Sequence, residues 1–169
     1  GASGPQGASG ASGPQGASGA SGPQGASGDN AGLRYNFSTT TTDSDPGTGV
    51  FRFNNATVGS VTQIFIDTAD QGSIDHTTYL DTWDDSTGTV KGTLLIDSNS
   101  AADTTYLVFQ VTSVTSATGY RKLGVAYVSG ALPSDSEACA ITFLRSGDTG
   151  PQGASGASGP QGASGASGP

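Results

Sequence analysis

The sequence predicts an all-β globular domain flanked by two collagen-like triple helices, with three identical chains forming a homotrimer. Two observations lead to this fold class. Glycine occupies every third position without a break in residues 1–28 and again in residues 147–169. Between these segments, in residues 29–146, apolar and polar residues alternate in short runs separated by turn sequences, which is typical of β-strands. We therefore divide the chain into a collagen-like segment, a β-rich trimerising domain and a second collagen-like segment.

Strict period-three glycine indicates a triple helix because only glycine fits where three chains meet at a shared axis. A flexible Gly/Ser linker would share the composition of these segments but would not keep an unbroken phase. Proline fills only one triplet in three, so we expect the flanking helices to be weak alone and the middle domain to hold three chains in register. The glycines predicted to face the axis are Gly4, Gly7, Gly10, Gly13, Gly16, Gly19, Gly22, Gly25, Gly150, Gly153, Gly156, Gly159, Gly162 and Gly165.

Seven segments of the middle domain are rich in the β-branched and aromatic residues that favour strands. They lie at residues 33–38, 50–53, 61–67, 90–97, 106–114, 120–128 and 138–145. About seven strands with turn signals between them predict an antiparallel sandwich or barrel. The alternation fails between residues 72 and 85, where the spacing of apolar residues predicts one short helix capped by Ser73.

The chain carries a formal net charge of −8, which disfavours nucleic acid and anionic lipid as partners through long-range repulsion. No run of about 18 apolar residues and no basic-plus-apolar leader is visible, so neither membrane insertion nor a signal peptide is predicted. Since the sequence begins and ends inside a repeat, we expect it to be a piece of a longer chain. No cofactor is expected, because the middle domain contains no P-loop, dinucleotide fingerprint or nucleophile elbow.

Clustered carboxylates are the only enzyme-like feature of the sequence. Asp67 with Asp70, or Asp81 with Asp84 and Asp85, could pair as general acid and base in the way that glycosidases require. These residues lie among Thr, Ser and Gly at the ends of predicted elements, where aspartate ordinarily caps turns. We therefore expect the protein not to be an enzyme and assign no catalytic residue.

Two loop aspartates are weak candidates for binding a metal ion. Asp43 and Asp45 precede Gly47 and offer the hard oxygen ligands that calcium prefers, but the loop lacks the further carboxylates of an EF-hand. His76 has no second histidine with which to form a zinc site. Cys139 alternates with small residues in a predicted strand, which favours a buried core thiol over a reactive one. On this basis no metal site is predicted.

An aromatic pair in the irregular segment is the candidate ligand-binding site. Tyr79 and Trp83 lie close to Asp84 and Asp85 in the sequence, and aromatic rings can stack on the face of a sugar. The other aromatic residues fall mostly in predicted strands, where we expect them in the core or in the trimer interface.

Several runs in the middle domain resemble a module found in collagen-like fibre proteins of tailed bacteriophages, especially marine and cyanobacterial ones. The runs are LRYNFS at 33–38, DPG at 45–47, FRFNNAT at 51–57, WDDST at 83–87, TSATGY at 115–120, VAYVSG at 125–130 and ITFLRSGD at 141–148. In those proteins such modules sit between Gly-X-Y segments, and the chains are regarded as virion fibres. The flanks depart from that pattern, since they carry nearly uncharged GAS and GPQ triplets where the phage proteins often carry GDK-type triplets.

The resemblance and the repeats together predict a structural module of a trimeric phage fibre, located in the virion. Its role would be that of a spacer, a trimerisation unit and a register unit, with host-surface contact as a further role. The expected partners are two further copies of the chain, other virion or fibre proteins, and a glycan or receptor on the host surface. The alternatives are a collagen-like adhesin or recognition module on a bacterial cell surface, and a glycan-cleaving tailspike.

Overall fold

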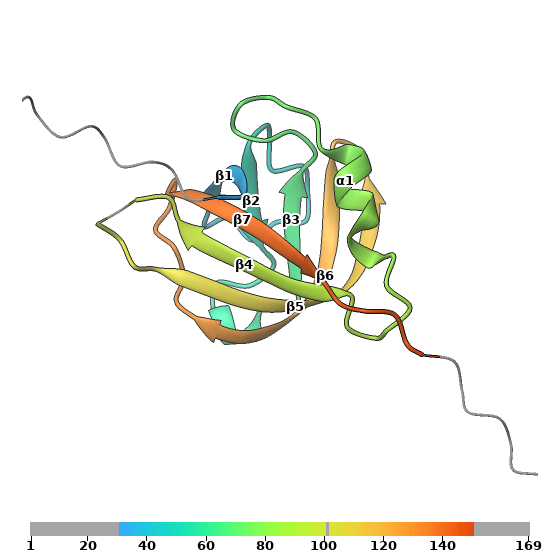
Figure 1. The fold of residues 1–169 in the computed structure, drawn as a ribbon. Coiled ribbons are helices and arrows are strands. Elements are labelled where there is room, and N and C mark those ends of the chain that lie inside the picture. Colours follow the sequence, from blue (N-terminus) through green and yellow to red (C-terminus); the bar gives the residue numbers. More distant parts are fainter. Residues whose placement is uncertain (1–30, 101, 151–169) are drawn as a thin grey trace, which may run out of the picture.

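The strands of the middle domain close into one barrel in the computed structural model, which describes residues 31–100 and 102–150 (Figure 1). Around the barrel the strands follow the order β1, β2, β3, β6, β5, β4 and β7. Their bounds are β1 Leu33–Ser38, β2 Val50–Phe53, β3 Gln63–Asp67, β4 Gly92–Ser98, β5 Tyr106–Ala117, β6 Tyr120–Gly130 and β7 Ala138–Arg145. The helical elements are the 3₁₀ turn η1 Val58–Ser60, the helix α1 Thr77–Asp81 and the 3₁₀ turn η2 Thr82–Asp84.

The predicted β-rich class and the number of strands are confirmed. β1, β2 and β7 have the predicted bounds. Apolar and polar residues alternate along β1, whereas β2 and β7 are mostly apolar runs between turn sequences. β5 and β6 are longer than predicted and form an extended hairpin. Gly119 allows the tight turn between them at a φ of 84°, in a region that side chains rarely adopt. Two shifts of register in this hairpin mark bulges, which increase the local twist of the strands.

One strand pair corrects the prediction of a wholly antiparallel sheet. β1 and β2 are parallel, with Asn36 opposite Val50 and Ser38 opposite Arg52, whereas the other neighbouring pairs of the barrel are antiparallel. Parallel neighbours cannot be joined by a tight hairpin and need a long crossover. Residues 39–49 supply that crossover here. The turn sequence around Asp45 therefore lies within a crossover instead of a hairpin.

The helix begins later than predicted, and Ser73 does not cap it. Ser73 adopts a positive φ of 61° inside a turn organised by Asp70, whose Oδ1 accepts hydrogen bonds from the backbone N–H groups of Gly72 and Ile74. Asp75 accepts hydrogen bonds from the N–H and the hydroxyl of Thr77 at the start of α1. This local bonding by aspartate delays the helix, because such side chains offer the backbone an alternative to helical bonds.

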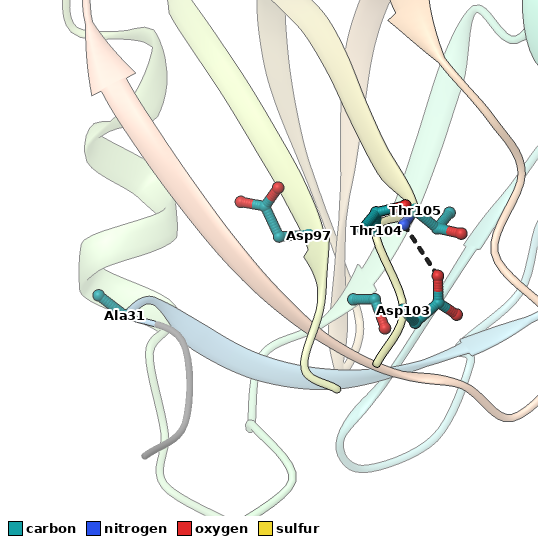
Figure 2. A pocket seen from close by; sticks show the side chains of 6 residues that line it. Ala31, Asp97, Asp103, Thr104 and Thr105 are labelled. Carbon is teal, nitrogen blue, oxygen red and sulfur yellow. Dashed lines mark hydrogen bonds between the residues drawn. The ribbon is translucent and has the colours of Figure 1, made fainter. Parts of the chain in front are cut away.

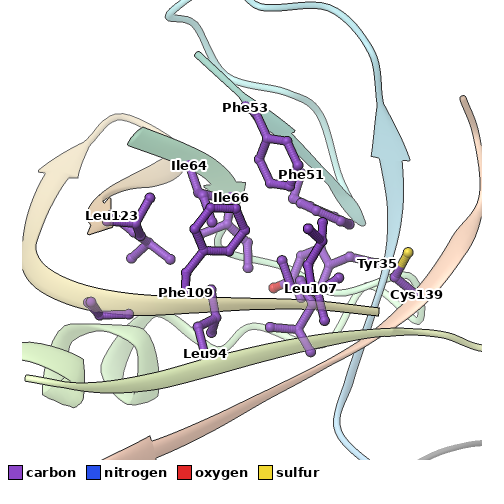
Figure 3. Packing of buried hydrophobic residues seen from close by; sticks show 14 of the residues in the cluster. Tyr35, Phe51, Phe53, Ile64, Ile66, Leu94, Leu107, Phe109, Leu123 and Cys139 are labelled. Carbon is purple, nitrogen blue, oxygen red and sulfur yellow. The ribbon is translucent and has the colours of Figure 1, made fainter. Parts of the chain in front are cut away.

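The barrel encloses one aromatic-rich core (Figure 3). Phe37 lies with its ring centroid 5.3 Å from that of Phe51 and 4.9 Å from that of Phe53, and Phe53 meets Phe109 at 5.5 Å. Such tilted and edge-on pairs add to the stabilisation from burial. The remaining buried members of the core are Tyr35, Val61, Ile64, Ile66, Leu80, Trp83, Leu94, Ile96, Leu107, Val111, Leu123, Val125, Cys139 and Ile141. The prediction of a buried thiol at Cys139 is confirmed.

Both ends of the described chain are attached to the barrel. Ala31 accepts a hydrogen bond through its carbonyl oxygen from the hydroxyl of Thr142 on β7. The carbonyl oxygen of Gly147 accepts a hydrogen bond from Ser86, and Asp148 accepts one from the N–H of Thr87. Figure 1 shows the two ends on opposite sides of the domain. The predicted boundary at residue 146 therefore falls within a hydrogen-bonded segment. Residues 1–28 and 151–169 of the predicted collagen-like flanks, and the axis glycines other than Gly150, lie outside the described residues.

Candidate functional site

The two candidate metal ligands lie in the crossover loop, residues 39–49, and their oxygens hold that loop on the barrel. Asp43 accepts hydrogen bonds from the hydroxyl of Tyr120 at 2.8 Å and from Nζ of Lys122 at 2.6 Å, both on β6. These bonds, with that from Lys122 the stronger, lower the pKa of Asp43. Asp45 accepts the backbone N–H of Gly47. Within the described ranges, no group of three or more His, Cys, Asp or Glu side chains is placed to hold a metal ion.

The first pair of predicted carboxylates is separated by its bonding partners. Asp67 is buried at the end of β3 and accepts the N–H of Ala69. Asp70 instead pairs with His76, with 3.0 Å between Oδ2 and Nε2. Burial opposes ionisation of Asp70, but its hydrogen bonds from His76 and from two backbone N–H groups outweigh burial and lower its pKa. These two carboxyl groups therefore serve different parts of the fold.

Asp67 is expected to make the protein less stable as the pH rises. Desolvation by burial, and then the neighbouring carboxyl of Asp45, raise the pKa of Asp67 above its ordinary value of 3.8. Because the folded state holds this proton more tightly than the unfolded state, its contribution to stability is complete below pH 3.8 and is lost as the pH rises through the raised pKa. Asp67→Asn cannot ionise and keeps the acceptor for Ala69.

We expect the variant and the original protein to have similar free energies of unfolding near pH 3 and the variant to be the more stable near pH 7. Urea unfolding across this range would measure the difference. Taking the difference cancels the carboxylates that titrate alike in both proteins, whereas Asp45, which interacts with Asp67, contributes to the difference. A difference that stays constant with pH would contradict a raised pKa at Asp67.

The candidate ligand-binding aromatics are divided between the core and the surface. Trp83 is 1% exposed and stacks on Phe143 of β7, with 4.8 Å between ring centroids and 15° between planes. Tyr79 is 44% exposed and meets Trp83 edge-on at 5.7 Å. The interpretation of Trp83 as a sugar-stacking ring is therefore wrong, because the rings of Phe143 and Tyr79 pack against it within the fold. Only Tyr79 of this pair presents a ring to solvent.

The second set of predicted carboxylates is used to dock the helical segment on the barrel. Asp84 accepts the backbone N–H of Val114 on β5 at 3.1 Å. Asp81 accepts two hydrogen bonds from the guanidinium of Arg121 on β6, and this pairing lowers the pKa of Asp81. Asp85 is exposed, and its N–H donates within the same turn to the carbonyl oxygen of Thr82. The bonds formed by Asp81 and Asp84 are structural.

The recess drawn in Figure 2 lies where the chain passes from β4 to β5 and has a volume of about 430 Å³. Asp103 bounds it on one side and accepts the N–H of Thr105 at 2.8 Å, which is a local turn bond. The recess is lined by Ala31, Asp97, Ser98, Asp103, Thr104 and Thr105. Small polar side chains and an open mouth give it no apolar anchor for a small molecule.

Sequence reasoning missed an apolar surface on the outside of β7, β4 and β5. These strands lie side by side at the front of Figure 1, with no helix over them. The side chains that alternate with the core residues of each strand point outward. We call this surface the β7–β4–β5 face; it consists of Ala140, Thr142, Leu144, Thr93, Leu95, Asp97, Tyr106, Val108 and Gln110.

The β7–β4–β5 face is apolar and partly exposed. Leu95 lies opposite Val108 of β5 on one side and opposite Thr142 of β7 on the other, which places it at the centre of the face. Leu144 is 56% exposed and Tyr106 is 48% exposed. Asp97 is the single charged member. Five of the nine side chains are apolar, and exposed apolar side chains that share one surface are typical of an interaction site.

The opposite side of the barrel is built differently. Arg52, Phe65 and Lys122 lie in one row across β2, β3 and β6. The crossover loop covers this row, and Arg52 donates to the carbonyl oxygens of Thr42 and Asp45.

The signal that could have revealed the β7–β4–β5 face is the presence of Leu95, Val108 and Leu144 at outward positions of their strands. That signal can be read only when the strand order is known.

Comparison of the chain with family models, with curated proteins and with solved structures finds no significant similarity. In the part of the chain that the structure describes, no helix has the length and apolar character needed to cross a membrane.

Proposed function

We propose that this chain is a structural module of a trimeric bacteriophage fibre, in which the barrel acts as a spacer between two collagen-like rods, joins three chains and sets their register. The observation that carries the proposal is the unbroken Gly-X-Y phase on both sides of one β domain. A Gly-X-Y segment has a structural purpose only when three chains share it, so the repeats supply the partners: two further copies of the same chain. The collagen-like flanks and the trimer are part of the proposal.

The way in which the chain ends are attached supports a role as spacer. The described ends lie on opposite sides of the barrel in Figure 1, as expected of a domain placed within a rod. The N–H of Thr149 donates to the hydroxyl of Thr87 at 2.9 Å, and the carboxylate of Asp148 accepts from the N–H of Thr87. These bonds extend the fixed part of the chain to the first Gly-X-Y triplet, so the position of the barrel can determine where the second repeat begins.

The same module can contribute to contact with a host surface, and Tyr79 and Asp85 are the residues of the predicted ligand site that are exposed. We propose no catalytic role, because the candidate carboxylates Asp70, Asp81 and Asp84 are engaged in bonds that hold the fold together. The proposed location is the virion. A bacterial surface adhesin would use the same rods, but a recognition head ordinarily ends a stalk, whereas here repeats follow the barrel.

The proposal is tested by the mass of the full chain and by the phase of its glycines. Sedimentation equilibrium should give about three times the chain mass of 16.5 kDa. Circular dichroism should show the signal of a collagen helix, lost on heating in a transition separate from that of the barrel. Gly13→Ala, which places a side chain at the axis, should lower the temperature of that transition. Ser12→Ala is the matched control, since the side chain of Ser12 points away from the axis.

A monomeric full chain would contradict the proposed function, as would a transition that Gly13→Ala and Ser12→Ala affect equally. The second result would show that glycine phase has no role and that the repeats act as a flexible linker.

A further inference from the structure

We propose that three copies of the chain contact one another through the β7–β4–β5 face, which makes this face the trimerisation surface of the barrel. The inference rests on the proposed function, because the repeats are what call for three chains. It adds the location and the chemistry of the contact: a nearly uncharged sheet surface centred on Leu95 and Val108.

Closure of the barrel restricts the ways in which copies can associate. Each strand has a neighbour on both sides, from β1 through to β7, which in turn pairs with β1. An open sheet can bind another chain by adding a strand to its edge. Here β5 extends past β4 at residues 112–117, where it pairs with β6 alone, and Asp84 of the same chain already accepts the N–H of Val114 in that stretch. Contact through side chains on the outer surface is therefore the more favourable way for copies to meet.

Charge then selects one part of that surface. Each chain carries a net charge of −8, so most ways of bringing three copies together would place like charges close to one another. The β7–β4–β5 face has one charged residue, Asp97, at its edge. The row of Arg52 and Lys122 on the other side is covered by the crossover loop of the same chain. The β7–β4–β5 face is thus the surface on which three copies can meet with little repulsion.

The positions of exposed apolar side chains favour the same part of the barrel surface. Six large apolar side chains are more than about a third exposed among the described residues. Tyr106 and Leu144 belong to the β7–β4–β5 face, and Val128 and Leu132 lie on and just beyond the neighbouring strand β6. Removing such side chains from water is the main driving force for association.

The two described ends of the chain are hydrogen-bonded to, or next to, strands of this face. β7 continues through Ser146 to the Gly-X-Y segment, and Ser146 donates its N–H to the carbonyl oxygen of Lys91 next to β4. The first described residue, Ala31, is bonded to Thr142 of the face. Contact between three β7–β4–β5 faces therefore brings three pairs of flanks toward a common axis, which a collagen helix requires.

Two glutamate substitutions test the location. Val108→Glu puts a charge at the centre of the face, and Ile74→Glu makes the same change at a side chain that is 59% exposed in a loop outside it. Sedimentation equilibrium of the full chain is measured above the melting transition of the flanks, so that the barrel alone must hold the trimer. We expect Val108→Glu to raise the protein concentration at which the trimer forms by on the order of 100-fold or more. Ile74→Glu should leave that concentration within about threefold of the value for the original chain.

The possible failures are distinguishable. If the original chain is trimeric below the flank transition and monomeric above it, the barrel is not the trimerising unit and the inference fails, while the proposed fibre remains. If both variants stay trimeric, or both dissociate equally, the face is not the contact. A monomer at all temperatures overturns the proposed function itself.

Cysteine labelling gives a second measurement in case Val108→Glu does not fold. Leu144→Cys lies on the face and Ile74→Cys lies outside it, and both original side chains are exposed in the single chain. In the trimer, Leu144→Cys should react with a maleimide at least about tenfold more slowly than Ile74→Cys, because a tightly packed interface excludes solvent and reagent. The native Cys139 does not interfere, since burial raises its pKa to about 12. Equal rates at the two positions would contradict the inference.

Discussion

Replacing Trp83 with alanine is expected to lower the free energy of unfolding by about 3–5 kcal/mol, the loss typical of removing a large buried aromatic side chain. Trp83 is 1% exposed and joins the helical segment to the barrel by stacking on Phe143. Its loss would leave a cavity under η2 and remove the ring that lies between Tyr79 of α1 and Phe143 of β7. Since small domains are stable by only about 5–15 kcal/mol, much of the total would be lost.

Unfolding by urea, followed by far-ultraviolet circular dichroism at one protein concentration, would measure this effect. Fluorescence cannot be used, because Trp83 is the single tryptophan of the chain. Trp83→Phe is the control: it keeps a ring against Phe143 and removes an indole N–H that has no acceptor among the described residues. We expect its loss to be well below that of the alanine variant. A loss below about 1 kcal/mol for Trp83→Ala would show that the surface interpretation was correct after all.

The second large effect is expected at Gly130. Replacing this residue with alanine should lower the free energy of unfolding by about 2–5 kcal/mol. Gly130 ends β6 with a φ of 114°, and a Cβ at this position would overlap the carbonyl oxygen of Tyr106 and lie 2.8 Å from Cα of Leu107. Strain at a positive φ and overpacking each cost about 1–3 kcal/mol. The same residue accepts a hydrogen bond from the hydroxyl of Tyr127, so displacement of the backbone would break that bond as well.

Gly47→Ala separates the two contributions to this loss. Gly47 has a φ of 91°, but nothing lies within 4 Å of a Cβ placed there. The control should therefore show backbone strain alone, about 1 kcal/mol. Thermal unfolding of both variants, followed by circular dichroism, would give the comparison. Equal losses would mean that close approach to Tyr106 contributes nothing.

Local patterns in the sequence were sufficient for most of the strands. β1, β2 and β7 could be predicted to the residue because each is a run rich in apolar residues that is bounded by turn sequences. The parallel pairing of β1 with β2 could not, because it depends on where the crossover loop carries the chain. The start of α1 was misjudged because Asp70 and Asp75 bond to nearby backbone groups that would otherwise enter a helix.

The candidate site was less predictable than the fold. Asp84 and Asp85 beside Trp83 suggested a surface, but the packing of Trp83 on Phe143 depends on a contact between residues distant in the sequence. The β7–β4–β5 face depends in the same way on strand order, since Leu95 and Leu144 become parts of one surface only when β4 and β7 are neighbours. Period-two patterns show which side chains point outward but not which strands lie together.

The entry and exit strands, β1 and β7, are direct neighbours, and this adjacency determines how the domain would respond to mechanical force. Tension applied between residues 31 and 150 would pass through the four residue pairs from Leu33–Ile141 to Asn36–Ala138. The strands from β2 to β6 lie outside this shortest path and would carry little of the load. The pulling strength of the domain would thus be set by one short ladder of hydrogen bonds, largely independently of the stability of the core.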